Sequence, residues 1–412
     1  MNMKLSKPIS PTLLSERYHS LDLLRGIAVL GILIMNIQSF AMIQAAYLNP
    51  TAYGDFTGIN RWVWILSHIF ADQKFMTIFS ILFGAGVILF TQRAEAKGVS
   101  AAGLHYRRTF WLLLIGLAHA HLLWYGDILV PYALCALVVF LFRKRKAKTL
   151  FIIGIIFISI PSIIYLLTGW SMQYWSPEQI QETLIGWKPS PEIVAKELSD
   201  FRGGWLEQMN QRAPSAFFLE TYLFLIWSMW RAGGLMLIGM AFFKWGFLTA
   251  ERKEEFYRKG LTIGMVVGLV FIVFGLIRNF QEDFIMEYSF FIGPQFNYWG
   301  SLFLSFAFIC LVMLLSKGNI KNRLFNSLAG VGRTAFSNYL LQTVICTTIF
   351  YGHGLGLIGY VERGTQFLIV IAVWIFQIFI TNIWLRYFRF GPAEWLWRSL
   401  TYWKLQPMKI TL

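Results

Sequence analysis

The run TLFIIGIIFISIPSIIYLLT at residues 149–168 contains no Asp, Glu, Lys or Arg, and almost all of its side chains are apolar. A helix of about 20 such residues crosses the roughly 30 Å hydrocarbon core of a bilayer. The rest of the 412-residue chain agrees, because 57% of it is hydrophobic, only 14% is charged and the mean hydropathy is +0.56. The sequence therefore predicts an all-α integral membrane protein and argues against a soluble class.

Similar apolar runs recur along the whole chain and predict about ten transmembrane helices in one polytopic bundle, a single domain over residues 1–412. Asp22 and Arg25 interrupt the start of the first run and no small-residue cleavage motif follows it, so we expect it to remain as a helix. The ten ranges lie near residues 23–44, 73–91, 109–125, 128–142, 149–168, 217–243, 260–278, 298–316, 334–351 and 365–388.

The net charge of +15 has an explanation in this topology. Counted by segment, 27 of the 36 Lys and Arg residues fall on alternate connections between the runs, as expected for the cytoplasmic side. Both termini are then cytoplasmic, including the N-terminal segment 1–20 and the C-terminal segment 389–412. The basic charge therefore predicts no nucleic-acid partner.

The largest connection on the outer side, residues 169–215, has more acidic than basic residues and contains four prolines. Two stretches within it are compatible with short helices, so we expect a cap over the outer face. The three cysteines, Cys135, Cys310 and Cys346, each lie inside an apolar run without paired spacing. This pattern excludes a disulfide scaffold and a zinc site, and no metal is expected.

Polar side chains at membrane depth are functional candidates, because they are costly unless they are paired or hydrated. Asn36 and His119 lie well inside predicted helices, and Asn338 and Gln342 share one helix face. The alternative is that these groups only link helices by hydrogen bonds. Arg231 is harder to explain structurally, since a guanidinium keeps its charge and needs a carboxylate, carbonyl groups or a ligand anion.

Two helix ends add further candidates. At the inner face, Gly332 and Arg333 precede a helix whose first amides are expected to be free, which with Arg25 would bind phosphate groups. The alternative for Arg25 is a pair with Asp22 or a position at the lipid headgroups.

At the outer face, Trp124, Gly126 and Asp127 form a turn, with Lys74 at the matching level of another helix. Asp127 can equally be a simple helix cap. Eight residues separate His119 from Asp127, about 12 Å along a straight helix, so we expect no direct pair unless the helix breaks at the turn.

Six ordered motifs resemble the YeiB-like family of bacterial membrane proteins, a domain of unknown function (DUF418), and they extend from residue 21 to residue 403. The motifs are LDLLRGIAVLGILIMNI (21–37), KFMTIFSILFGAG (74–86), HLLWYGDILVPYAL (121–134), WRAGGLMLIGM (230–240), GRTAFSNYLLQTVICTTIFYG (332–352) and GPAEWLWRSLTYW (391–403).

The opening motif is also similar to that of the wider transmembrane acyltransferase superfamily, whose members transfer an acyl group from a cytoplasmic thioester to an acceptor beyond the membrane. Many members have a catalytic His where this chain has Asn36. The glucosaminide N-acetyltransferase branch shares the Asn and has its His later. His68 falls in that region, although its spacing to Asp72 differs from that branch.

The resemblance implies a transmembrane acyltransferase in the bacterial cytoplasmic (inner) membrane. Acyl-CoA, such as acetyl-CoA, would be the donor, held by Arg25, Gly332, Arg333, Asn338 and Gln342. His119, or else His68, would be the general base, with Asp127 in support.

The acceptor, a small molecule, a sugar or a lipid, would meet Asn36, Lys74, Trp124 and Arg231. The alternatives are a transporter of a small anionic solute or lipid, and a lipid- or quinone-binding membrane protein without catalysis. Membrane lipids are expected partners, and a homodimer is compatible with the sequence.

Overall fold

The computed structural model describes residues 17–318 and 322–410 of the chain. Within these ranges the chain is helical and forms no strand beyond an isolated bridge between Phe388 and Lys409. Most of the predicted segment 1–20, and the last two residues of segment 389–412, lie outside the described part.

Seven helical elements are long and apolar enough to cross a membrane, and two shorter apolar helices accompany them, at Leu129–Phe142 and Ala335–Phe350. Each of the ten predicted ranges overlaps a helix of the structure. The described helices are α1 (His19–Ala41), α2 (Ala45–Leu48), α3 (Gly58–Phe70), α4 (Lys74–Ala96), α5 (Ala101–Leu122), α6 (Leu129–Val139), α7 (Ala147–Ser171), α8 (Pro177–Trp187), α9 (Pro191–Arg202), α10 (Met209–Glu220), α11 (Met229–Lys244), α12 (Glu254–Gln281), α13 (Met286–Ser289), α14 (Gly293–Lys317), α15 (Arg323–Arg333), α16 (Ala335–Phe350), α17 (Arg363–Tyr387) and α18 (Pro392–Tyr402). The molecule is a helical multi-pass membrane protein.

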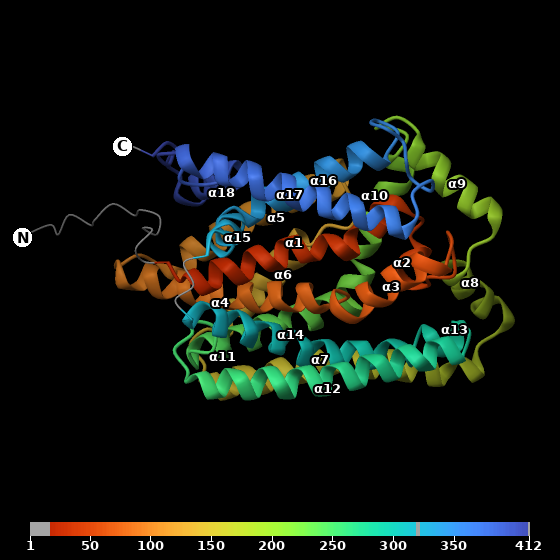
Figure 1. The fold of residues 1–412 in the computed structure, drawn as a ribbon, viewed down its shortest axis with the longest axis horizontal. Helices are drawn as coiled ribbons and strands as arrows, with labels where there is room; N and C mark the ends of the chain where they lie inside the picture. Colours follow the sequence, from red (N-terminus) through yellow and green to blue (C-terminus); the bar gives the residue numbers. More distant parts are fainter. Residues whose placement is uncertain (1–16, 319–321, 411–412) are drawn as a thin grey trace, which may run out of the picture.

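The long helices run along the longest axis of the molecule, with α1 near its centre (Figure 1). Helices α7, α11, α12 and α14 lie on one side of α1, and α16, α17 and α18 lie on the other. The short helices α8, α9 and α13 gather at one end of the bundle, while α15 and α18 lie at the opposite end (Figure 1). We call these the cap end and the α18 end.

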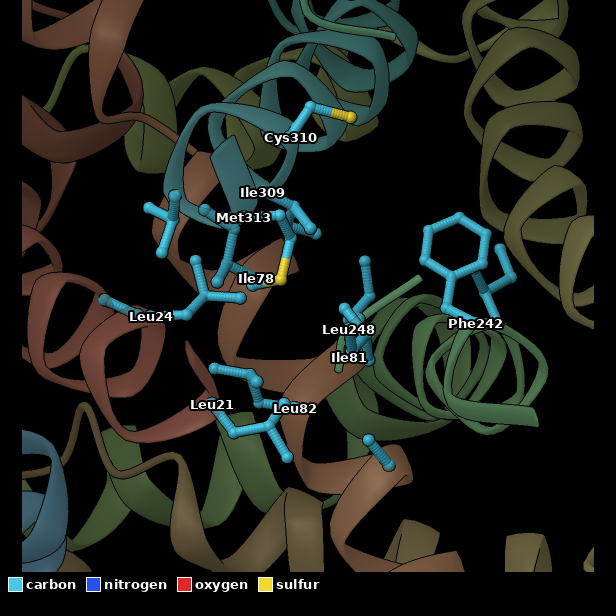
Figure 2. Close-up of a cluster of buried hydrophobic side chains, with 14 of the residues drawn as sticks. Leu21, Leu24, Ile78, Ile81, Leu82, Phe242, Leu248, Ile309, Cys310 and Met313 are labelled. Atoms are coloured by element: carbon cyan, nitrogen blue, oxygen red, sulfur yellow. The ribbon is translucent and has the colours of Figure 1, made fainter. Parts of the chain in front are cut away.

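The core around α1 is a cluster of mainly aliphatic side chains, most of them from α1, α4, α11 and α14. Figure 2 shows Leu21 and Leu24 of α1 facing Ile78 and Ile81 of α4, with side chains of α11 and α14 closing the cluster. Helix α1 is buried on nearly all sides, as its buried residues show. In a membrane such packing depends on close van der Waals contact more than on removal of apolar surface from water.

Helices α1 and α15 cross in direct backbone contact. A Cβ atom placed at Gly332 would lie 1.8 Å from the carbonyl oxygen of Asp22, and one placed at Gly26 would lie 1.9 Å from that of Leu328. Both positions therefore require glycine, whose missing side chain lets the two backbones approach.

At the cap end, the carboxylate of Glu197 on α9 is buried and accepts a hydrogen bond from the backbone N–H of Gln44, at 2.8 Å. Burial raises the pKa of Glu197 from its ordinary value of 4.5 to about 7. Between these two values the folded protein keeps a proton that the unfolded chain has lost.

We therefore expect the stability of the protein to fall as the pH rises from about 5 to about 7, by at most about 3 kcal/mol. The variant Glu197→Gln should flatten this dependence in melting curves of the detergent-purified protein. The control is Glu182→Gln, which changes an exposed carboxylate of the same cap. An unchanged slope in Glu197→Gln would mean that another group titrates.

Candidate functional site

A cavity of about 300 Å³ opens at the α18 end of the bundle, which is within the range of small-molecule sites. Side chains of α1, α4, α5, α6, α16 and α18 line it, together with the end of α15. Its deeper wall is apolar, with Val29 and Ile32 of α1, Phe83 of α4 and Leu112 of α5 among the lining residues.

The mouth of this cavity is strongly basic. Among residues 17–318 and 322–410, seven Lys and Arg side chains and two carboxylates line it: Arg17, Arg25, Arg93, Lys97, Arg108, Arg333 and Arg398, against Asp22 and Glu394. A surplus of positive charge around an apolar hollow favours an amphipathic anion.

Asp22 neutralises only part of this charge. Arg17 donates two hydrogen bonds to its carboxylate, at 2.7 and 2.8 Å, and Arg25 donates a third at 2.8 Å. Arg25 thus makes the ion pair with Asp22 that the sequence left open as an alternative to phosphate binding, and part of its side chain still faces the cavity.

Three other guanidinium groups of the mouth make no ion pair with a carboxylate in residues 17–318 and 322–410. Arg108 instead lies over the rings of Trp397 and Phe90, at 4.2 and 4.7 Å from their centroids. Burial, followed by repulsion from Arg17, lowers the pKa of Arg398 to about 10. For Arg333, burial also lowers the pKa, and its Nε atom is buried without a partner among the described residues. A bound anion would relieve this repulsion.

The structure corrects the expectation of free amides after Gly332. Glu394 of α18 accepts hydrogen bonds from the N–H groups of Phe336 and Ser337, at 2.7 and 3.3 Å, and from the hydroxyl of Ser337. The start of α16 is therefore already occupied by a carboxylate. Gly332 is needed for the contact between α1 and α15, as described above, and does not offer a free anion-binding backbone.

The deep end of the cavity, opposite its mouth, lies next to a buried histidine. Tyr339 of α16 lines the cavity, and its hydroxyl oxygen accepts a hydrogen bond from the N–H of Ile128 at 3.2 Å. On its other side the ring of Tyr339 lies 5.3 Å from the ring of His119. His119 itself does not line the cavity, so Tyr339 separates the two.

The structure brings His119 and Asp127 together, in contrast to the 12 Å expected along a straight helix. Helix α5 ends at Leu122 and α6 begins at Leu129, so the chain turns back between them. As a result Nδ1 of His119 lies 2.7 Å from Oδ1 of Asp127, and both side chains are about 1% exposed. The second oxygen of Asp127 accepts a hydrogen bond from the N–H of Val130 at 2.7 Å, so Asp127 is also a helix cap.

The other nitrogen of His119 faces a hydroxyl group. Its Nε2 atom lies 2.9 Å from Oγ1 of Thr343 on α16, which is 1% exposed. Trp124 lies beside this group, with its ring 6.4 Å from that of His119 and stacked on Phe40 at 4.1 Å. The indole N–H of Trp124 is buried and has no partner within the described ranges.

Asn338 and Gln342 do not face the cavity, which corrects the expectation of a shared hollow. Asn338 donates to Oγ1 of Thr381 on α17 at 3.1 Å. Gln342 donates to the carbonyl of Val29 on α1 and to Gln377 on α17, both at 3.0 Å. These amides link α16 to its neighbours, which was the alternative interpretation. Asn36 is half-buried and makes no side-chain hydrogen bond in the described part of the chain.

His68 and Lys74 belong to a second, partly buried polar group that includes neither Trp124 nor Asp127. Nδ1 of His68 lies 3.1 Å from Asp72, and Asn297 donates to the same carboxylate at 2.7 Å. The ammonium group of Lys74 donates to Asn297 and to the carbonyl of His68.

Arg231 lies in the same region and is fully buried. It donates to the carbonyl of Tyr298 at 3.0 Å and to the hydroxyl of Ser301 at 2.9 Å, and its guanidinium lies 4.0 Å from the centroid of the Tyr298 ring. With a longer bond to the hydroxyl of Thr77 at 3.4 Å, its partners are a carbonyl, two hydroxyls and an aromatic face, and only its Nε atom lacks a partner among residues 17–318 and 322–410.

Several residues of these sites were missed by sequence reasoning, among them Arg108, Tyr339, Thr343, Glu394 and Arg398. Glu394 and Arg398 stood inside the recognised motif at 391–403, but a terminal cytoplasmic segment gave no reason to place them at a cavity. Thr343 directly follows Gln342 in another motif, yet a single threonine in an apolar helix is unremarkable by itself.

The fold and the site together define a helical multi-pass membrane protein that contains a basic-mouthed cavity and a buried histidine–carboxylate pair. The chain belongs to the YeiB-like DUF418 family, and residues 242–404 match the family described as "Protein of unknown function (DUF418)".

Over most of its length the chain is 33% identical to "Uncharacterized protein YeiB" of Escherichia coli (strain K12), over 390 residues covering 94% of this chain and 96% of that protein. It is 34% identical to "Uncharacterized protein YxaH" of Bacillus subtilis (strain 168), over 414 residues covering 97% and 98% of the two chains. No solved structure matches the chain.

Proposed function

We propose that this protein is a membrane-bound acyltransferase that takes an acyl group from an acyl-CoA and delivers it to an acceptor on the other side of the membrane. The observation that carries the proposal is the cavity, which has a basic mouth and an apolar deep part. The deep part ends at Tyr339, whose ring lies next to that of His119. Phosphate groups of the donor would meet Arg108, Arg333 and Arg398, while its acyl-bearing arm would enter the apolar part.

The proposal includes a topology of ten spans, with both termini and the α18 end in the cytoplasm of a bacterium and the cap end facing outward. Helix α5, the helical stretch α6 with its following turn Phe140–Phe142, and α16 would cross the bilayer in addition to the seven long elements. The cavity then opens toward the cytoplasm, where acyl-CoA is made. The bacterial relatives and the basic inner segments support the inner membrane as its location.

His119 is the proposed general base. In this arrangement Asp127 accepts a hydrogen bond from Nδ1–H of His119 and so leaves Nε2 free to take a proton. The oxygen or nitrogen of the acceptor attacks the thioester carbonyl, the carbon–sulfur bond breaks, and the departing thiolate receives the proton from His119. His68 pairs with Asp72 in another, partly buried group, and neither residue is among the described residues that line the cavity, which favours His119.

The test uses purified protein in lipid nanodiscs with acetyl-CoA. Calorimetric titration measures binding, and release of free CoA thiol measures turnover with water or added lipid and sugar acceptors. We expect saturable binding of acetyl-CoA and a rate of thiol release above that of empty nanodiscs. The absence of binding at millimolar acetyl-CoA would end the proposal.

A matched pair of variants at Gly86 tests whether the cavity holds the donor. Gly86 lines the cavity, and a Cβ atom at this position would have no neighbour within 4 Å among the residues that the structure describes. A leucine side chain should enter the hollow and weaken acetyl-CoA binding about tenfold, or roughly 1.4 kcal/mol, whereas alanine should leave binding unchanged. Equal affinity of Gly86→Leu and the wild type would place the donor elsewhere.

Transport of an anionic solute is a second candidate, favoured by one observation. The helix before the buried Arg231 is interrupted by a π-helical stretch at Phe224–Ser228, a feature often found at functional sites. Counterflow of a labelled anion into proteoliposomes distinguishes the two candidates, because a transporter moves its solute intact, whereas the enzyme releases CoA thiol.

A further inference from the structure

We infer that Thr343 is a nucleophile that carries the acyl group as an ester between donor and acceptor. The inference rests on the proposed acyl transfer, and it replaces the direct attack of the acceptor on the thioester by two successive transfers through a covalent intermediate.

The first support is geometric. Thr343, His119 and Asp127 form a continuous hydrogen-bonded chain, 2.9 Å from Oγ1 of Thr343 to Nε2 of His119 and 2.7 Å from Nδ1 to Asp127. A hydroxyl within about 2.6–3.2 Å of a base, with the base oriented by a third group, is the arrangement that activates serine and threonine nucleophiles. The N–H of Val130 donates to the second carboxylate oxygen of Asp127, so the position of Asp127 at the end of this series of hydrogen bonds is fixed.

The second support is the hydrogen-bond partner of the Thr343 hydroxyl. Threonine hydroxyls in helices commonly bond to a carbonyl of the preceding turn, as Thr347 and Thr348 of the same helix do with Val344. Thr343 makes no such bond within the described residues, and its hydroxyl faces only His119. With Asp127 accepting from Nδ1, the bare Nε2 atom accepts the hydroxyl proton, which raises the nucleophilicity of the oxygen.

The third support is location. Thr343 lies one helical turn beyond Tyr339, the residue that closes the deep end of the cavity, so about 6 Å of helix separates them. Movement of the Tyr339 side chain would join the cavity to the hydroxyl. Beside the triad, the unpartnered indole N–H of Trp124 is a donor in the right neighbourhood for a developing oxyanion.

The proposed step is balanced without a further reactant. Oγ1 of Thr343 attacks the thioester carbonyl, a carbon–oxygen bond forms, the carbon–sulfur bond breaks, and the hydroxyl proton passes through His119 to the leaving thiolate. An acceptor hydroxyl or amine then attacks the ester from the cap end. Its proton passes through His119 to Thr343, which is restored.

The experiment is acyl labelling of the full-length protein in nanodiscs with radiolabelled acetyl-CoA and no added acceptor, followed by peptide mass spectrometry. We expect the label on Thr343 in the wild type, retained in Thr343→Ser and absent in Thr343→Val. The control is Thr347→Val, because within the described residues the Thr347 hydroxyl bonds to the helix backbone and not to His119. It should be labelled like the wild type.

The outcomes separate this inference from the proposed function. If the wild type releases thiol from acetyl-CoA but Thr343→Val does so at the same rate, or the label lies on another residue, the acyl-enzyme is overturned and acyl transfer stands. If the wild type neither binds acetyl-CoA nor releases thiol, both fail. Retention of the label in Thr343→Ser guards against loss through misfolding alone.

Discussion

Replacement of His119 by glutamine should lower the rate of thiol release from acetyl-CoA by ~10²–10⁴-fold, the usual contribution of a general base. Glutamine keeps a polar side chain in the buried position but cannot take up the proton. Because His119 does not line the cavity, the affinity for acetyl-CoA should stay within about twofold of the wild type.

This separation of rate from affinity is what distinguishes a catalytic group from a structural one. The matched control is His121→Gln, which changes a partly exposed histidine of the same helix that pairs with Glu220 at 3.0 Å. The control should retain its rate. A His119→Gln variant that turns over at the wild-type rate would remove His119 from the mechanism.

The second large effect is expected at a glycine. Gly332→Ala should destabilise the protein by about 4 kcal/mol or more. The new methyl group would clash with backbone atoms of α1, which cannot move aside as a flexible side chain could. The added Cβ would fall 1.8 Å from the carbonyl oxygen of Asp22. Helices α1 and α15 would have to separate, and the mouth of the cavity would open with them.

Size-exclusion profiles and melting curves in detergent measure this effect. Gly330→Ala is the control in the same helix, since its added Cβ would approach other atoms only to 3.4 Å, an ordinary contact. Alanine at that position should be neutral or slightly stabilising, by about 0.5–1 kcal/mol, through its helix preference. Equal stability of the two variants would contradict the close crossing of the two helices.

Hydropathy located the long helices because every helix that crosses a bilayer needs about 20 mostly apolar residues whose backbone groups are hydrogen-bonded within the helix. The uncharged run 149–168 illustrates this, since it falls inside α7 at Ala147–Ser171. The two short helices α8 and α9 were also predictable, because the serine and proline at the start of each helix favour a helix start by local interactions.

The site was much less predictable, since its contacts join residues far apart in sequence. The pairing of His119 with Asp127 depends on a helix end at Leu122 that no proline marks. Asn338 and Gln342 were correctly placed on one helix face. The spacing of the two residues does not show whether that face packs against other helices or lines a cavity, and in the structure it packs against α1 and α17. Glu394 reaches the start of α16 from another motif altogether, so only the fold reveals it.

The arrangement of the cavity mouth has a consequence for biosynthesis. Asp22 and Arg17 at one end of the sequence and Glu394, Trp397 and Arg398 near the other form the same rim. A chain still being translated cannot complete this entrance until the ribosome has passed residue 402, so the cavity is assembled last. Premature stop codons upstream of α18 should therefore leave an inserted bundle that lacks part of the cavity rim and does not bind the proposed donor.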